Sequence, residues 1–244
     1  PDSGRYCLGL TVQLRLATFN IRHGAVAGGR RVRPDLLAAA CRDLDADVLA
    51  LQEVDVGTQR AGGVDLASLV AEATGMAMVF GATLSPFRGG QYGNALLVRG
   101  ALEDAEVMRL PRHWWPWGRR EPRNAIVARV VVDAVHLSVA ATHLSVRRWE
   151  SRPQAVAVGR ALSGRPAPRA LIGDLNRSPA ELTRLRVLSD YDLADIPPTF
   201  PSRAPVLRLD HVAVQGLTIV DHMVVATAVS DHRAVVVTCE AAAP

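Results

Sequence analysis

The chain has 244 residues, of which 49% are hydrophobic, so it can bury a large core in one domain or in two small ones. Its formal charge of +4 depends on arginine alone, because the sequence contains no lysine, and this balance favours an anionic partner only mildly. No apolar run approaches the roughly 20 residues that span a bilayer, and the three cysteines lack the spacing of a disulfide framework or a zinc site.

We expect one soluble, monomeric domain over residues 1–244. The sequence begins at Pro1 rather than at a methionine, so residues 1–13 are expected to be a tag remnant or a flexible lead. The cytoplasm is the expected compartment, unless a signal or anchor precedes Pro1.

Strands and helices alternate along the first part of the chain. Pro34 suits the first turn of a helix, and Gly75 suits the residue that ends the next one. Each of two strands ends on a polar residue, Asn20 or Glu53. The expected elements are strand 14–20, helix 33–44, strand 46–53, helix 64–75 and a turn leading into a strand over 89–100.

The second part of the chain repeats this alternation. A hairpin of two strands is expected to end at His143, and Ser151 is expected to cap the helix that follows. Ser178 and Glu181 form an S-x-x-E capping box for a fourth helix, which is expected to reach Leu188. The expected elements are hairpin 123–146, helix 151–162, strand 169–176, helix 179–188, and strands 209–214 and 234–240.

Asp174 and Asn176 follow an apolar run, two positions apart. Alternate residues of a strand share a face, so both side chains are expected to point the same way at the strand's end. The same spacing of 33 residues separates Asn20 from Glu53 (53 − 20) and His143 from Asn176 (176 − 143). With a strand, helix, strand order in both places, this echo predicts two similar halves packed together.

Polar residues end the expected strands throughout the chain. One such carboxylate is commonly a helix cap or a turn residue, but eight polar residues at strand ends are harder to explain in that way. These residues are Asn20, Glu53, His143, Asp174, Asn176, Asp210, Asp231 and His232.

The oxygen donors of this set indicate a hard divalent metal. Glu53, Asp231 and the amide of Asn20 suit Mg²⁺ or Mn²⁺ rather than zinc. Beside histidines and an Asp–Asn pair, such a metal predicts phosphoester hydrolysis. The sequence has neither a G-x-S-x-G motif nor a Walker loop, so water is the expected nucleophile.

Seven short motifs occur in this order along the chain: TFNIR, LALQEVD, YGNALL, ATHLS, LIGDLN, LDHVAV and SDHRAV. This ordered set, from about Leu14 to Val237, resembles the endonuclease/exonuclease/phosphatase superfamily, which includes pancreatic deoxyribonuclease, neutral sphingomyelinases and inositol polyphosphate phosphatases. The resemblance implies an α/β fold: a four-layer α/β sandwich of two packed mixed sheets flanked by helices.

The resemblance also implies roles for individual residues. By this resemblance Glu53 is the principal metal ligand, with Asn20 and Asp231 in or beside the metal shell. Asp174 orients or deprotonates the attacking water, and Asn176 holds a phosphoryl oxygen. The remaining implied catalytic residues are His232, oriented by Asp210, and His143, which donates to the phosphate or assists the leaving group.

Three further residues are candidates for substrate binding. Tyr92 and Asn94 are expected either to reach the phosphate or only to shape the turn, and Arg123 to contact phosphate. Arg22 stands where abasic-site endonucleases carry an acidic residue, which argues against that activity.

Trp114, Trp115 and Trp117 lie among arginines in RLPRHWWPWGRR. This composition suits peripheral contact with a membrane, stacking against bases, or a loop folded over the core. The leading hypothesis is a Mg²⁺- or Mn²⁺-dependent phosphoesterase acting on a lipid headgroup or another small organic phosphate. The alternatives are a nuclease acting on DNA or RNA and a non-catalytic binding module on the same fold.

Overall fold

In this computed structural model, the described residues are 11–84, 89–112 and 121–242. They form two six-stranded mixed sheets. In spatial order the first sheet contains β11 (Thr218–Val225), β12 (Ala234–Ala242), β1 (Thr11–Asn20), β2 (Val48–Val56), β4 (Gln91–Val98) and β3 (Ala77–Leu84). In spatial order the second contains β5 (Ala101–Arg109), β6 (Asn124–Val132), β7 (Val135–His143), β8 (Arg169–Asp174), β10 (Asp210–Gln215) and β9 (Asp192–Leu193).

Helices connect these strands on the outer faces. The α-helices are α1 (Pro34–Asp43), α2 (Leu66–Thr74), α3 (Arg148–Ser163) and α4 (Pro179–Leu182). The 3₁₀-helices are η1 (Arg22–Gly24), η2 (Gln59–Ala61) and η3 (Arg186–Leu188). None of the helices among the described residues is long and apolar enough to cross a membrane.

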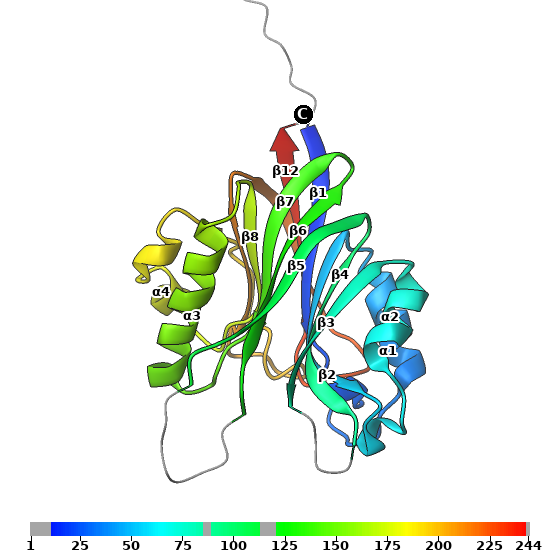
Figure 1. Cartoon of the computed structure of the whole chain (residues 1–244). Coiled ribbons are helices and arrows are strands. Elements are labelled where there is room, and N and C mark those ends of the chain that lie inside the picture. Colours follow the sequence, from blue (N-terminus) through cyan, green and yellow to red (C-terminus); the bar gives the residue numbers. More distant parts are fainter. Residues whose placement is uncertain (1–10, 85–88, 113–120, 243–244) are drawn as a thin grey trace, which may run out of the picture.

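Three hydrophobic layers hold the sheets and helices together (Figure 1). The central layer joins the two sheets through residues such as Leu16 of β1 and Ile172 of β8. A second packs the first sheet against α1 and α2, and a third packs the other sheet against α3. The four-layer α/β sandwich predicted from the sequence is therefore confirmed.

The two sheets share one pattern of strand pairing. In the first sheet β1 and β2 are parallel and linked by α1, and in the second β7 and β8 are parallel and linked by α3. On either side of each parallel pair the neighbouring strands are antiparallel. The predicted echo of two similar halves is thus present as two sheets of matching topology.

Several predicted boundaries differ from the observed ones. Strand β1 begins at Thr11, inside the predicted lead segment, because residues 11–13 pair with residues 240–242 of β12. The prediction omitted the four edge strands, β3, β5, β9 and β11. Strand β9 has only two residues, and β5 and β11 are mostly exposed and so lack the apolar alternation of a half-buried strand.

The helices after His143 also differ in part. Helix α3 begins at Arg148, so Ser151 lies inside it rather than capping it. Before the helix, the Ser145 hydroxyl and N–H donate to Glu150 and Gln154, which ties the preceding turn to the first turns of α3. The predicted fourth helix is split into α4 and η3, although its capping box is present.

Candidate active site

Strand periodicity places the main polar side chains between the two sheets. On β1, Leu14 and Leu16 belong to the central core, and Asn20 continues the same alternation at the strand's end. On β8, Ile172 belongs to that core and Asp174 comes two residues later. Asn20 and Asp174 are therefore the polar end of the inter-sheet core, and both are buried.

Sheet register brings two more residues to Asp174. In the parallel pair of β7 and β8, His143 lies opposite Asp174, and in the antiparallel pair of β8 and β10, Asp210 lies opposite it on the other side. Both residues continue the core-facing alternation of their own strands. His143, Asp174 and Asp210 thus form a row across the end of the second sheet.

Glu53 reaches this end of the molecule through a bulge. The prediction that this strand ends at Glu53 is wrong, because β2 continues to Val56. Its pairing with β4 shifts register between Leu51 and Val54, and Glu53 lies in that shift with a left-handed φ of 57°. A bulge re-aims a side chain, and a positive φ at a non-glycine residue costs about 1–3 kcal/mol, which the surrounding structure must offset.

The Asn20 amide joins the two sheets. Its nitrogen donates to Glu53 Oε1 at 3.1 Å and to Asp174 Oδ2 at 3.0 Å. The half-exposed Asp231 lies next to His232, with Arg22 Nε 3.5 Å from its Oδ2. Asn20, Glu53 and Asp174 are therefore brought together directly, with Asp231 nearby.

Burial and negative neighbours act on Glu53. Burial raises the pKa of Glu53, the Asn20 amide opposes this, and the carboxylates of Glu121 and Asp231 raise the pKa further. Oxygen donors crowded in this way suit a hard divalent cation, which would relieve their repulsion. Glu53, Asn20 and Asp231 thus fit a Mg²⁺ or Mn²⁺ ion by their chemistry.

A second acidic group lies in the same region. Among the described residues, ligand atoms of Asp174, Asp210 and His232 lie within 4.8 Å of one another. His232 Nδ1 is 2.9 Å from Asp210 Oδ2, so that nitrogen is engaged in a hydrogen bond. The group is therefore held together by a hydrogen bond, and its two carboxylates make it the second candidate position for a cation.

His232 carries a positive charge at neutral pH. Burial disfavours its charged form, but the carboxylate of Asp210, helped by those of Asp174 and Asp231, outweighs burial and raises the pKa of His232 to about 9. Asp210 is held in turn by the Thr199 hydroxyl, which donates to Oδ2 at 2.5 Å. Asp210 thus holds the His232 imidazolium through Nδ1 and leaves its Nε2–H to donate. The contact from Asp210 that was predicted to orient His232 is present.

Asp174 is a buried carboxylate beside a second carboxylate, so its charged form is disfavoured. Burial and Asp210 raise the pKa of Asp174 to about 7, against the opposing effects of His232 and Asn20. Its Oδ2 lies 3.4 Å from His143 Nε2 and 3.8 Å from His232 Nε2. A carboxylate with a pKa near neutrality suits a general base.

His143 is held as a neutral imidazole. Arg123 Nη1 lies 3.0 Å from its Nδ1 and also donates to Glu121 Oε1 at 2.9 Å. Because Arg123 can only donate, Nδ1 accepts and the proton is on Nε2, facing Asp174. Burial, with the charges of Arg123 and His232, holds the pKa of His143 well below its usual value.

The prediction that Asn176 shares a strand face with Asp174 is wrong, because Asn176 is not on a strand. Strand β8 ends at Asp174, and Asn176 has a left-handed φ of 49°. Its backbone N–H donates to Asp174 Oδ1 at 3.1 Å, and its amide donates to the carbonyl of Leu144 at 2.9 Å. Asn176 therefore ties the ends of β7 and β8 together and supports Asp174.

The predicted substrate-binding residues are placed differently from one another. Arg123 contacts His143, as described, and Tyr92 is buried with the Arg60 guanidinium 5.3 Å from its ring centroid. Asn94 is also buried, and its amide nitrogen donates to Asn124 Oδ1 at 2.7 Å. Asn94 thus links β4 to β6, across the two sheets, through a polar pair.

Four residues near the site were not among the predictions. Ser230 receives the N–H of His232 and donates to the Asn20 carbonyl, and the Phe200 ring lies 4.8 Å from the His232 ring. Thr199 and Glu121 hold Asp210 and Arg123, as described above. Ser230 lies inside the motif SDHRAV, Glu121 begins the sequence EPRN, which leads into β6, and Thr199 and Phe200 lie between prolines; these were the only signals in the sequence. The predicted tryptophans, Trp114, Trp115 and Trp117, lie outside the described residues.

Comparisons with known proteins agree with this architecture. The model of the endonuclease/exonuclease/phosphatase family matches residues 17–232. Among curated protein sequences, no significant match is found.

Solved structures share the fold over nearly the whole chain. The endonuclease/exonuclease/phosphatase from Beutenbergia cavernae DSM 12333 has a TM-score of 0.75 at 23% identity, over 94% of this chain and 72% of that chain. A family protein from Bacteroides thetaiotaomicron has a TM-score of 0.75 at 14% identity, over 96% of both chains. A mannosyl-6-phosphatase from Bacteroides thetaiotaomicron VPI-5482 has a TM-score of 0.72 at 16% identity, over 93% of this chain and 99% of that chain. With a family match over residues 17–232 and this shared fold, the chain belongs to the endonuclease/exonuclease/phosphatase family.

Proposed function

We propose that this chain hydrolyses phosphoesters with an activated water and a divalent metal ion, Mg²⁺ or Mn²⁺. The observation that carries the proposal is the position of Asp174, buried between the sheets and in reach of Asn20, His143 and His232. Family membership supports phosphoester hydrolysis at a coarse level.

Glu53, Asn20 and Asp231 would hold the metal. When bound, the ion would neutralise charge on the phosphoryl oxygens. The carboxylate and amide oxygens of these three residues are the ligands such an ion prefers, and the carboxylates of Glu121 and Asp231, which raise the pKa of Glu53 beyond the larger effect of burial, are charges that a cation would balance.

The chain's own residues supply the proton chemistry. Asp174 takes a proton from the attacking water, and the imidazolium of His232 donates a hydrogen bond to a phosphoryl oxygen as charge develops there. Asp210 keeps His232 charged and oriented through the 2.9 Å contact to Nδ1. His143, neutral and protonated on Nε2, donates to the phosphate or to the leaving oxygen, while Asn176 holds Asp174 in place.

The substrate that we propose first is a lipid headgroup or another small organic phosphate. The fold shared with a mannosyl-6-phosphatase is consistent with a small phosphate ester. Arg22, paired with Asp231, adds positive charge where abasic-site endonucleases have a carboxylate. Nucleic acid is the second candidate. It is favoured by exposed arginines that line a groove beside α3: Arg152, Arg160, Arg184 and Arg186.

A substrate panel tests this function. We expect hydrolysis of bis-p-nitrophenyl phosphate with Mg²⁺ or Mn²⁺, and complete loss of turnover in EDTA with recovery when metal is added back. Sphingomyelin, phosphoinositides, mannose 6-phosphate, plasmid DNA and RNA, assayed alongside, identify the substrate class. Turnover of none of them with metal, or equal turnover in EDTA, would contradict the proposal and favour a binding module.

The Asp210–His232 pair predicts a specific pH dependence. If catalysis needs the imidazolium, activity is lost as pH rises through the pKa of His232, which is about 9. Asp210→Asn removes the charge that raises this pKa, so burial then dominates and the alkaline limb of kcat should move to lower pH by about 1–3 units. Asp195→Asn, which changes an exposed carboxylate paired with Arg208, serves as the control. An alkaline limb at the same pH in both variants would remove His232 from the mechanism.

A further inference from the structure

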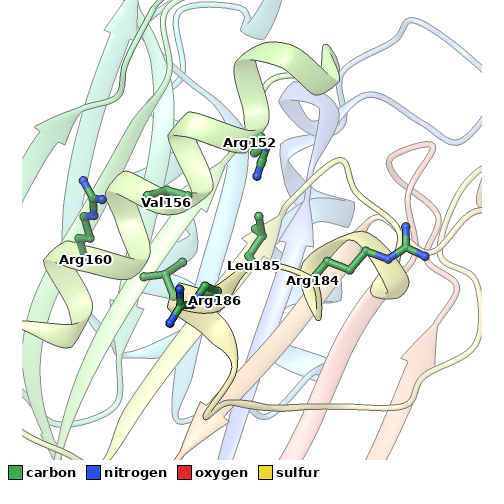
Figure 2. A pocket seen from close by; sticks show the side chains of 7 residues that line it. Arg152, Val156, Arg160, Arg184, Leu185 and Arg186 are labelled. Carbon is green, nitrogen blue, oxygen red and sulfur yellow. The ribbon is translucent and has the colours of Figure 1, made fainter.

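A groove lies on the helical face of the second sheet, between α3 and the segment around η3 (Figure 2). Its volume is about 450 Å³. Four of its lining residues are arginines, and we refer to it as the arginine groove: Arg152, Arg160, Arg184 and Arg186.

These four side chains are exposed and carry unbalanced charge. Several other arginines pair with carboxylates, as Arg208 does with Asp195 and Arg60 with Asp55. Within residues 11–84, 89–112 and 121–242, none of the four arginines of the groove forms an ion pair or a side-chain hydrogen bond. The arginine groove is therefore a concentration of positive charge that a ligand would have to neutralise.

The spacing of the arginines indicates an extended anion. Arg152 and Arg160 lie eight residues apart on α3, which corresponds to about 12 Å along the helix. Arg160 and Arg184 lie toward opposite ends of the groove (Figure 2). Guanidinium groups spread along the groove in this way suit a ligand that carries several separated negative charges.

The floor of the groove is aliphatic. Val156, Leu185 and Val187 line it, and η3 packs tightly on α3 because Gly159 has no side chain: a Cβ there would lie 2.6 Å from Val187 Cγ2. An anion that is charged along its length but apolar between its charges fits such a surface. The sugar–phosphate backbone of a nucleic acid, with its sugar and base faces between phosphates, has this character.

The positive region continues toward the active site. Arg177 directly follows Asn176, and its guanidinium donates to the carbonyl of Arg148 at the start of α3. Burial, together with the charges of Arg148 and Arg152, lowers the pKa of Arg177, although Glu181 opposes this. Arg152 belongs to the groove, so arginines connect it with the catalytic end of the molecule.

We propose that the arginine groove binds the sugar–phosphate backbone of a single-stranded nucleic acid, at a site separate from the catalytic residues. Arginine matches phosphate oxygens with paired N–H donors, which suits repeated phosphate contacts. This binding does not depend on the proposed hydrolysis: the groove would hold a strand whether or not the active site cleaves it.

The test measures binding without catalysis. A fluorescein-labelled single-stranded 20-mer is titrated with the full chain in EDTA, by anisotropy, over a range of NaCl concentrations. The groove variant is Arg160→Gln/Arg184→Gln, and the control is Arg42→Gln/Arg99→Gln, which removes the same formal charge at two exposed arginines outside the groove, one of them, Arg99, paired with Asp45. We expect the groove variant to weaken binding at least tenfold and to reduce the slope of log K against log salt by about 1.4, because each lost phosphate contact contributes about 0.7.

Each remaining outcome is decisive. Equal weakening by both double variants would overturn the proposal, since net charge alone would then explain binding. If the groove variant loses binding to anionic phospholipid vesicles but binds the 20-mer as the wild type does, the groove binds a lipid surface and the proposal is overturned. Turnover of bis-p-nitrophenyl phosphate is measured in parallel and should be unchanged in both variants. If the wild-type chain has no such turnover, the proposed hydrolysis fails while the binding measurement still decides the groove.

Discussion

Replacing Asp174 with asparagine is expected to lower kcat for a phosphodiester by about 10²-fold or more, because asparagine has the same shape but cannot accept a proton from water. This substitution changes the chemistry of the side chain while keeping its size and part of its hydrogen bonding. The Asn20 amide and the Asn176 N–H both donate to the Asp174 carboxylate, and an asparagine oxygen can keep one of these contacts. Stopped assays with bis-p-nitrophenyl phosphate under saturating Mg²⁺ measure the loss.

The control is Asp221→Asn, which makes the same chemical change on the exposed edge strand β11. Both variants should melt close to the wild-type temperature and bind the metal with similar affinity. Near-normal turnover by Asp174→Asn would mean that Asp174 only holds the turn before Asn176, and that another group activates the water.

Replacing Glu53 with glutamine is expected to weaken Mg²⁺ binding and to lower kcat/KM by about 10³-fold, because a metal contributes several kcal/mol of charge stabilisation in the transition state. The amide keeps the size of the side chain and so preserves the packing of the bulge in β2. It removes the negative charge of a half-buried carboxylate whose pKa is raised by desolvation, so the apo protein should be at least as stable as the wild type.

Calorimetric titration with Mg²⁺ and Mn²⁺ measures the affinity, and Glu72→Gln on the exposed face of α2 is the matched control. Unchanged affinity of Glu53→Gln for both ions would place the metal elsewhere, with the group of Asp174, Asp210 and His232 as the next candidate. A gain in thermal stability of the apo protein together with lost metal affinity would support Glu53 as a ligand.

Much of the polar cluster between the sheets could be predicted because its positions follow from local rules. A strand alternates its side chains, so an apolar strand that ends on a polar residue presents that residue where the core ends. Asn20, His143, Asp174 and Asp210 all obey this rule. The order of strands and helices did not say which strand ends would meet; the observed pairing of β7, β8 and β10 does.

The rule failed where the backbone leaves the regular strand. Glu53 would face away from the inter-sheet core by simple alternation after Val48 and Ala50, and only the bulge re-aims it. Asn176 would share a face with Asp174 only if β8 continued, but the chain turns with a positive φ instead. A bulge or a left-handed residue is set by the strands packed around it, which a period of two cannot reveal.

The sequence by itself determined the longer helices, the central strands and the polar strand ends, because these depend on neighbouring residues and on patterns of two or 3.6 positions. Only the tertiary structure decided what depends on residues far apart in the chain. It paired Asn94 with Asn124 across the sheets. It placed Asp210 where its charge makes His232 more basic in spite of burial, and burial together with Asp210 makes Asp174 a weaker acid. It also assembled the arginine groove from two segments, since Gly159 lets η3 pack against α3 and brings their charges together. Burial, electrostatic coupling and packing are sums over neighbours in space, and the folded chain sets those neighbours.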